Sequence, residues 1–338
     1  MTKTWSSTWI VTGGAGFIGT NLVRVLRELR PEVRVVVVDK LTYAGNRAFL
    51  DGVVDGDAAI FEQVDIADAA EVERVFATYA PNGVFHLAAE SHVDRSITGP
   101  RAFIDTNIVG TFTLLEAARR HWLEQDRAGR FLHVSTDEVY GDLGPEDPAF
   151  TEETAYKPSS PYSASKAASD HLAHAWHRTY GLDVVITNCS NNFGPFQYPE
   201  KLIPVIIGKI QRREKLPVYG DGTNVRDWLY VVDHAEALLR AFEDGASGRN
   251  YNIGTQNEWQ NIQLVELLCD LYDEEQGTQD SRALISFVTD RPGHDRRYAI
   301  DSTRTEQELG WRARFEFKEA LRQTLRWYLE HAPTYWKM

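Results

Sequence analysis

Residues 9–19 decide the fold, and they read Trp9-Ile10-Val11-Thr12-Gly13-Gly14-Ala15-Gly16-Phe17-Ile18-Gly19. An apolar run leads straight into closely spaced glycines, which fit G-x-G-x-x-G from Gly14, and a helical pattern follows over 17–29. Such glycines let the backbone turn tightly and approach a pyrophosphate, whose charge then lies at the positive N-terminus of the helix. Taken alone, the glycines would equally fit a tight turn that needs small residues.

A second feature favours the cofactor interpretation. Asp39 ends the next apolar run, twenty residues past Gly19. An acid at this position accepts hydrogen bonds from ribose hydroxyls and repels a 2′-phosphate. The combination predicts a dinucleotide site that prefers NAD to NADP, although the neighbouring Lys40 weakens that preference a little.

Strand-like and helical patterns alternate through the first 190 residues. The expected strands are 9–12, 33–39, 60–64, 83–87, 131–135 and 184–189, and the expected helices are 17–29, 69–79, 111–120 and 161–180. This alternation predicts an α/β fold, a doubly wound parallel sheet of the Rossmann type. After about residue 190 the elements shorten and Gly and Pro become more frequent. We therefore expect a cofactor domain over 1–190, rejoined by segments near 228–254, and a smaller α/β substrate-binding lobe mainly over 191–338.

Charge and composition exclude several classes of function. The 338 residues carry a formal net charge of −13, which argues against general binding to nucleic acid or membranes because these need a basic surface. The two cysteines form no CxxC pair, and the N-terminus lacks the apolar core of a signal peptide. We expect a cytoplasmic protein. His171, His174 and His177 lack the accompanying ligands of a recognised motif, so no metal site is expected.

Tyr162 and Lys166 are the candidate catalytic pair. They lie four residues apart at the start of the helix that Pro161 opens, so both side chains share one face. A tyrosine has a pKa of about 10, and a nearby ammonium together with a positive nicotinamide favours the phenolate. Tyr162 can then take the proton of a hydroxyl while hydride leaves the same carbon. This spacing also occurs by chance at surfaces, and only its combination with the dinucleotide signature makes it informative.

Thr136, Asp137 and Glu138 follow the fifth expected strand. Functional residues of open parallel sheets lie at the carboxyl ends of strands, although Asp and Thr also suit a helix cap or turn. Two adjacent carboxyl groups can divide acid and base roles if their environments separate their pKa values.

Together these residues resemble the extended short-chain dehydrogenases/reductases that modify sugar nucleotides. The Thr-Asp-Glu trio is similar to that of the dTDP-glucose 4,6-dehydratases, whereas related epimerases lack the Asp-Glu pair and GDP-mannose dehydratases carry a Glu without this Asp and use NADP. Further segments resemble the same dehydratases over residues 8–330. They include 41–46 (LTYAGN), 87–96 (LAAESHVDRS), 191–195 (NNFGP), 199–204 (PEKLIP), 225–228 (VRDW) and 290–295 (DRPGHD).

The resemblance implies which residues bind each ligand. NAD is expected at Gly13, Gly16, Phe17, Ile18, Gly19, Asp39, Lys40, Leu41, Thr42, Asp65, Ile66, Leu87, Ala88, Ala89, Ser91, Thr106, Tyr162, Lys166 and Asn192. The dTDP-sugar is expected at Ser91, Thr136, Asn191, Lys201, Leu202, Pro217, Val218, Tyr219, Arg226, Asn261, Asp290, Arg291 and His294, where the cationic side chains suit a diphosphate.

The resemblance also implies a reaction and an assembly. Oxidation at carbon 4 of the sugar is followed by loss of water across carbons 5 and 6, with Glu138 as base and Asp137 as acid. Hydride then returns to carbon 6 while carbon 5 is reprotonated. Thr136 is expected to hydrogen-bond the carbon-4 oxygen. A homodimer is expected through a four-helix bundle formed by helices near 101–125 and 161–180. Two alternatives stay open from the residues: a sugar-nucleotide 4-epimerase, and a non-catalytic NAD-binding sensor on the same fold.

Overall fold

A seven-stranded parallel sheet forms the centre of the larger lobe in this computed structural model, which describes residues 5–290 and 294–335. Each neighbouring pair of strands is parallel, which confirms the predicted fold class. In spatial order the strands are β10 (Asn250–Ile253), β6 (Val184–Cys189), β5 (Arg130–Thr136), β4 (Gly83–His86), β1 (Ser7–Thr12), β2 (Val33–Asp39) and β3 (Ala59–Gln63).

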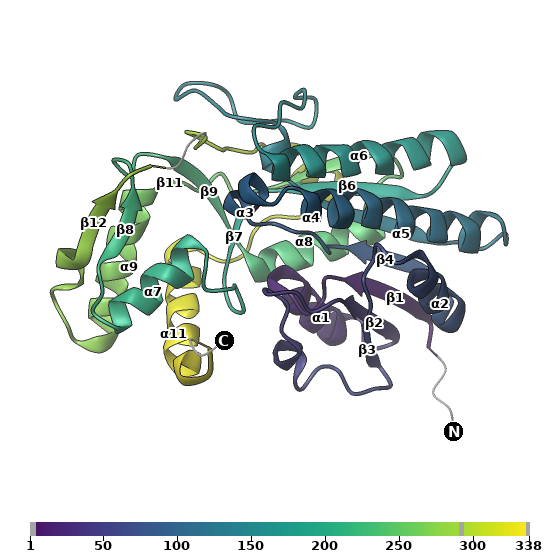
Figure 1. Ribbon diagram of the computed structural model, residues 1–338, viewed down its shortest axis with the longest axis horizontal. Helices are drawn as coiled ribbons and strands as arrows, with labels where there is room; N and C mark the ends of the chain where they lie inside the picture. The colour runs from purple at the N-terminus through teal and green to yellow at the C-terminus, as the bar shows by residue number, and fades with distance from the viewer. Residues whose placement is uncertain (1–4, 291–293, 336–338) are drawn as a thin grey trace.

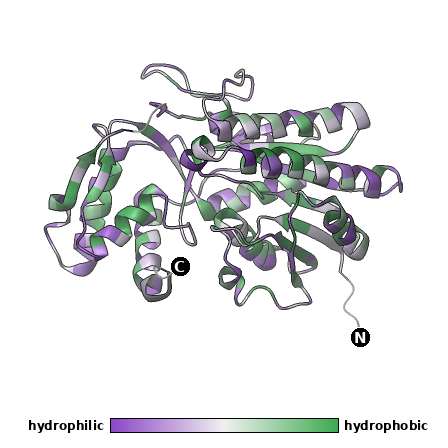
Figure 2. Ribbon diagram, viewed as in Figure 1, coloured by the Kyte–Doolittle hydropathy of each residue, from purple (hydrophilic) through white to green (hydrophobic). Residues whose placement is uncertain are grey.

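Helices cover both faces of this sheet (Figure 1). One face packs against α1 (Phe17–Leu29) and α8 (Val231–Asp244), whose apolar side chains share a core with the strands. The other face packs against α2 (Ala69–Tyr79), α5 (Thr111–Ala118) and α6 (Pro161–Tyr180). Because both faces are covered, the inner strands are apolar on each side. Strand β6, under α6, is accordingly mostly green in Figure 2.

Local signals explain where α6 begins and ends. Ser160 caps its N-terminus through a reciprocal capping box with Ser163, and Pro161 occupies the first turn. Gly181 ends the helix with φ +75°, a left-handed conformation that glycine adopts without steric cost. This register fixes the direction of Tyr162 and Lys166.

The helical segment before β5 is longer than the sequence pattern indicated. It begins with α3 (Val93–Thr98) and α4 (Arg101–Phe103), and α5 is flanked by π-helical turns over Ile104–Gly110 and Arg119–Leu123. The predicted helix 111–120 is therefore the middle of a rod that extends from 101 to 123, which lies beside α6 (Figure 1).

Within the described residues, the smaller lobe contains two short sheets and three α-helices. One sheet has the order β11 (Glu258–Gln260), β9 (Val225–Tyr230), β7 (Asn191–Phe193), and the other pairs β12 (Ile285–Val288) with β8 (Leu216–Tyr219). Helices α7 (Leu202–Gln211), α9 (Asn261–Gln276) and α11 (Phe317–Tyr335) pack around a separate apolar core. Within the described residues, no helix combines the length and hydropathy needed to cross a bilayer.

Three segments beyond residue 190 return to the larger lobe. Two of them, α8 and β10, were expected from the sequence. The third was not: α10 (Thr303–Leu309) and Trp311 join the core that α1 and α8 share with the large sheet. This segment is short and mixed in character, so its sequence alone carries no strong pattern.

Candidate active site

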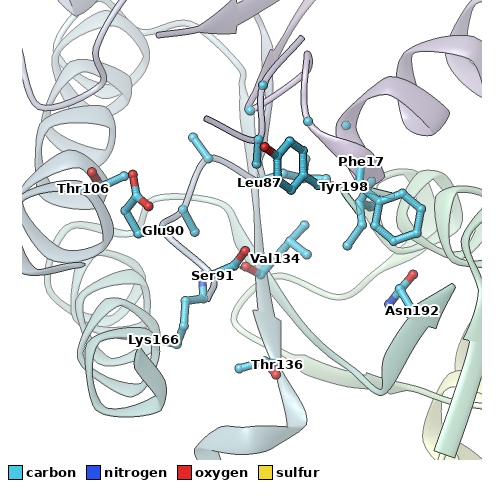
Figure 3. A pocket seen from close by; sticks show the side chains of 18 of the residues that line it. Phe17, Leu87, Glu90, Ser91, Thr106, Val134, Thr136, Lys166, Asn192 and Tyr198 are labelled. Carbon is cyan, nitrogen blue, oxygen red and sulfur yellow. Dashed lines mark hydrogen bonds between the residues drawn. The ribbon is translucent and has the colours of Figure 1, made fainter. Parts of the chain in front are cut away.

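One cavity of about 300 Å³ opens at the carboxyl ends of β1, β4, β5 and β6. Side chains from both lobes line it, with Phe17 and Asn192 opposite Thr106 and Glu90 in Figure 3. A ligand site at this edge is typical of a doubly wound sheet. The cavity is therefore where cofactor and substrate have to meet.

The glycine turn brings the backbone unusually close to its neighbours. Gly13 has φ +68°, and a Cβ there would lie 2.8 Å from Ala88 Cα. A Cβ on Gly19 would overlap the carbonyl oxygen of Gly13. Side chains are thus excluded where the turn meets the start of α1, which leaves backbone amides accessible to a phosphate.

Asp39 connects this turn to the end of β2. Its carboxylate accepts the backbone amides of Ala15 at 3.0 Å and Leu41 at 2.8 Å. Burial raises the pKa of Asp39, and these two hydrogen bonds oppose the increase. Each carboxylate oxygen has a second lone pair, so the residue remains able to accept from ribose hydroxyls. Next to it, Lys40 Nζ donates to Thr106 Oγ1 at 3.1 Å and to Asp65 at 3.4 Å.

Tyr162 and Lys166 both project from α6 into the cavity and are nearly buried, with 8% and 4% exposure. Lys166 Nζ reaches toward β5, where it donates to the carbonyl oxygen of Val134 at 2.8 Å (Figure 3). Burial and the nearby Glu138 raise the pKa of Tyr162 well above its usual value, while a hydrogen bond with Thr136 lowers it. These effects favour the neutral phenol, so forming a phenolate needs additional positive charge.

Asp137 and Glu138 are adjacent in sequence but lie in different environments. Asp137 is 2% exposed, and its Oδ2 is buried without a hydrogen-bond partner. Burial, then Glu138 and Asp227, raise the pKa of Asp137 well above the usual range. Glu138 is only partly buried and its backbone amide donates to Thr136 Oγ1 at 3.3 Å. Burial thus favours the protonated form of Asp137, beside the more accessible carboxyl group of Glu138.

Most of the cofactor residues expected from the sequence line the cavity. Those that do are Gly13, Gly16, Phe17, Ile18, Gly19, Asp39, Lys40, Thr42, Ile66, Leu87, Ala88, Ala89, Ser91, Thr106, Tyr162, Lys166 and Asn192. Leu41 and Asp65 are not among the lining residues, but they contact Asp39 and Lys40 respectively.

The expected substrate residues divide into two groups. Ser91, Thr136, Asn191 and Lys201 line the cavity, and Lys201 Nζ donates to the carbonyl oxygen of Ser91 at 3.3 Å. The others that the structure describes do not line it: Leu202, Pro217, Val218, Tyr219, Arg226, Asn261, Asp290 and His294. Arg291 lies outside the described residues.

Several of the expected substrate residues that do not line the cavity lie near the end of β12. His294 bonds Asp290 at 2.7 Å, and its ring lies 6.4 Å from that of Tyr219. Arg226 donates to the carbonyl oxygen of Asp295 at 2.8 Å. The charge of Arg226 also lowers the pKa of Asp137, so Arg226 lies near the carboxyl pair.

Some lining residues were not singled out from the sequence. They are Val38, Ala44, Gly45, Val64, Val134, Ser135, Cys189, Ser190, Gln197, Tyr198 and Glu200. Many of them are next to predicted site residues in the sequence, so the predicted strand ends already placed them near the site. Tyr198 and Glu200 come from the start of the smaller lobe, and no spacing rule connects them to the glycine turn.

Similarity to known proteins is extensive. A family model described as GDP-mannose 4,6 dehydratase matches residues 10–324. The chain is 55% identical to dTDP-glucose 4,6-dehydratase 1 of Escherichia coli K12 over 335 residues, covering 95% of this chain and 92% of the relative. It is 55% identical to dTDP-glucose 4,6-dehydratase of Neisseria meningitidis over 338 residues, covering 97% and 94%.

This chain belongs to the dTDP-glucose 4,6-dehydratase family. Solved structures agree with that membership. The dTDP-glucose 4,6-dehydratase DesIV of Streptomyces venezuelae, crystallised with NAD bound, is 44% identical with a TM-score of 0.89, covering 96% of this chain and 98% of that one. The UDP-glucose 4-epimerase of Thermotoga maritima is 30% identical with a TM-score of 0.85, covering 96% and 99%. The fold is thus shared with epimerases, while sequence identity is higher to the dehydratases.

Proposed function

We propose that the chain converts dTDP-glucose to dTDP-4-keto-6-deoxyglucose, with NAD as a resident cofactor that each turnover regenerates. The observation that carries this proposal is the Asp137–Glu138 pair, which shares one cavity with Tyr162 and Lys166. Oxidation at carbon 4 needs only the last two residues, whereas elimination of water needs an additional acid and base.

The residues around the glycine turn fit NAD. Gly13, Gly16 and Gly19 line the cavity without side chains, as a pyrophosphate needs, and the buried Asp39 suits ribose hydroxyls and disfavours a 2′-phosphate. Asn191, which is expected to contact the sugar nucleotide, lines the cavity with an amide oxygen that is buried without a hydrogen-bond partner, as expected of a group that meets a ligand donor. NAD, when bound, accepts a hydride from the sugar and later returns it.

The protein's own groups move the protons. Tyr162 takes the proton of the carbon-4 hydroxyl, and Thr136 hydrogen-bonds the oxygen there. The ketone at carbon 4 makes the hydrogen on carbon 5 acidic, and Glu138 removes it as a carboxylate. Asp137, which burial keeps protonated, donates to the hydroxyl that leaves carbon 6. Its unpartnered Oδ2 supports this assignment, because a buried carboxyl oxygen without a partner is available to the substrate.

The deciding experiment is incubation of the purified protein with dTDP-glucose in deuterated water, followed by mass and NMR analysis. A 4-keto-6-deoxy product with deuterium at carbon 5 is the expected result. Formation of dTDP-galactose at unchanged sugar mass would instead indicate an epimerase. No turnover of any dTDP-, UDP-, CDP- or GDP-sugar despite bound NAD would indicate a cofactor sensor.

We also propose that the protein is a homodimer formed by the 101–123 rod and α6. Large apolar side chains are exposed along this rod: Ile104, Val109, Phe112 and Leu123. Tyr180 at the end of α6 is exposed as well. Apolar groups gathered on adjacent helices are typical of an interface, and pairing two such helices from each copy gives four.

A further inference from the structure

A fully buried carboxylate lies one helical turn beyond Lys166. Asp170 is 0% exposed, and four neutral groups donate hydrogen bonds to it. His133 Nε2 lies 3.0 Å from Oδ1, while Ser135 Oγ and Tyr156 OH reach Oδ2 at 2.8 and 2.9 Å. The amide of Asn188 adds a longer contact at 3.4 Å. The hydrogen bond and charge of His133, then the charge of Lys166 and the hydrogen bond from Ser135, keep the pKa of Asp170 below its usual value despite burial.

Lys166, in contrast, carries a buried positive charge that neutral groups do not compensate. The residue is 4% exposed, and its ammonium donates a hydrogen bond to a neutral group, the carbonyl oxygen of Val134. Burying an ammonium without a compensating charge is costly. On an α-helix, residues four apart lie on the same face, so Asp170 is placed on the face that carries Lys166.

The other titratable groups around this pair are uncharged near neutral pH. Burial lowers the pKa of His133 to about 4 and raises the pKa of Cys189 to about 12. It also lowers the pKa of His86 and His174 and raises the pKa of Tyr140 and Tyr156. These groups come from β4, β5, β6, α6 and the segment that joins β5 to α6. Lys166 and Asp170 are therefore an oppositely charged pair among groups that are themselves uncharged.

We propose that Asp170 is the buried counter-charge of Lys166, a positioning residue that keeps the ammonium beside Tyr162 in its charged form. His133, Ser135 and Tyr156 hold the carboxylate in place, so the charge acts through Lys166 rather than on the substrate. The inference rests on the proposed function, in which Lys166 supports proton removal by Tyr162.

The test isolates oxidation at carbon 4 by using dTDP-6-deoxyglucose. This compound has no hydroxyl to eliminate at carbon 6, so NADH absorbance reports the step that uses Tyr162 and Lys166 without Asp137. Because the oxidation requires the ammonium form of Lys166, its rate should fall at alkaline pH, where Lys166 loses its proton. Asp170→Asn removes the negative charge and favours the neutral amine of Lys166. The alkaline limb of the pH–rate profile, where the rate falls, should therefore move to lower pH by about 1 to 3 units. An alkaline limb that stays at the wild-type pH in a folded Asp170→Asn protein would overturn the proposal.

Tyr156→Phe is the matched control. It removes one hydrogen bond from the same carboxylate but keeps the charge, because Asp170 remains ionised throughout the alkaline range. Its alkaline limb should coincide with that of the wild type. A shift equal to that of Asp170→Asn would mean that the cluster acts by packing, against the proposal.

A double-mutant cycle on thermal stability tests the proposal even where Asp170→Asn fails to fold. Thermal unfolding at pH 6 is compared for Asp170→Asn, Lys166→Met and the double variant. If an uncompensated ammonium destabilises Asp170→Asn, adding Lys166→Met should restore part of the loss or recover soluble protein. A double variant no more stable than Asp170→Asn would contradict the charge pairing. This cycle needs no turnover, so it stays informative if the wild type does not oxidise the sugar and the proposed function itself fails.

Discussion

At the scale of single residues, Asp137 and Glu138 illustrate how one strand end can supply both an acid and a base. The sequence places two carboxyl groups after β5 but does not say which one is buried. The structure resolves this, since Asp137 is buried with an unpartnered Oδ2 while Glu138 is partly exposed. Such a separation of environments is what allows adjacent acids to hold different protonation states.

The proposed acid role predicts a selective defect. Asp137→Asn keeps the shape of the side chain but cannot protonate the departing hydroxyl. We expect NADH absorbance to appear on mixing with dTDP-glucose, while formation of the dehydrated product slows by about 10²- to 10⁴-fold. Stopped-flow absorbance and product mass measure the two steps separately. Glu146→Gln, at an exposed acid, is the control. Equal loss of oxidation and dehydration in Asp137→Asn would argue against an acid specific to elimination.

The same residue predicts a pH-dependent change in stability. Because the pKa of Asp137 is higher in the folded protein than in the unfolded chain, its contribution is most favourable below the unfolded pKa and declines as pH rises toward the folded one. Asp137→Asn removes this cost. Its melting temperature should therefore exceed that of the wild type at pH 8, with a difference that shrinks toward pH 4. Thermal unfolding across this range tests the sign, and a constant difference would contradict it.

At the scale of elements, apolar periodicity and glycine positions in the sequence predicted most of the helices and strands of the larger lobe. The helices 17–29, 69–79 and 161–180 were predicted at their observed bounds. Side-chain caps at Asp68 and Ser160 mark the start of the last two, and the glycine turn marks the start of the first. The strands were correct to within about two residues. The smaller lobe was predicted only as a region, since short strands such as β11 and β12 carry no distinctive alternation. The return of α10 depends on long-range packing, which local pattern does not encode.

The exposed rod beside α6 predicts how the dimer can be separated. Phe112 is 45% exposed on α5, and its ring lies 5.8 Å from that of Trp176 on α6. Phe112→Glu would place a charge in the proposed interface at a high desolvation cost. We expect light scattering after size exclusion to change from the mass of two chains to that of one. Leu29→Glu, at a similarly exposed position on α1, should leave the mass unchanged. A wild-type protein of single-chain mass would exclude the dimer.

At the scale of the whole molecule, the cavity is completed only when the two lobes meet. Residues near the glycine turn and the end of β4 were predictable from the sequence because strand ends of a parallel sheet converge. Tyr198, Glu200 and the group around Asp290 were harder to place, since their position depends on how the smaller lobe packs on the larger one. The resemblance to a family supplied several of these positions, where spacing could not.

Glu200 links the lobes across the cavity. Its carboxylate accepts a hydrogen bond from Tyr43 OH at 3.1 Å and lies 3.6 Å from the guanidinium of Arg95. That guanidinium also stacks over the Tyr43 ring, 3.4 Å from its centre. Tyr43 follows the lining residue Thr42, so these contacts tie the loop after β2 to the smaller lobe. A cofactor regenerated in every turnover has no need to leave, and contacts that hold the cavity closed favour its retention.

This arrangement predicts that Tyr43→Phe weakens cofactor retention while leaving the chemistry intact. Losing one hydrogen bond to a charged acceptor is worth about 1.5 to 3 kcal/mol at most, and less where Glu200 regains water. We therefore expect NAD to dissociate up to about tenfold faster, as measured by the decay of bound cofactor after rapid dilution. Tyr79→Phe removes a comparable tyrosine–glutamate hydrogen bond, to Glu62 at the far edge of the sheet, and should not change the rate. Activity of Tyr43→Phe at saturating NAD should match the wild type, because the Tyr43 hydroxyl bonds Glu200 rather than the acid–base residues. An unchanged dissociation rate would show that the link between lobes does not limit cofactor release.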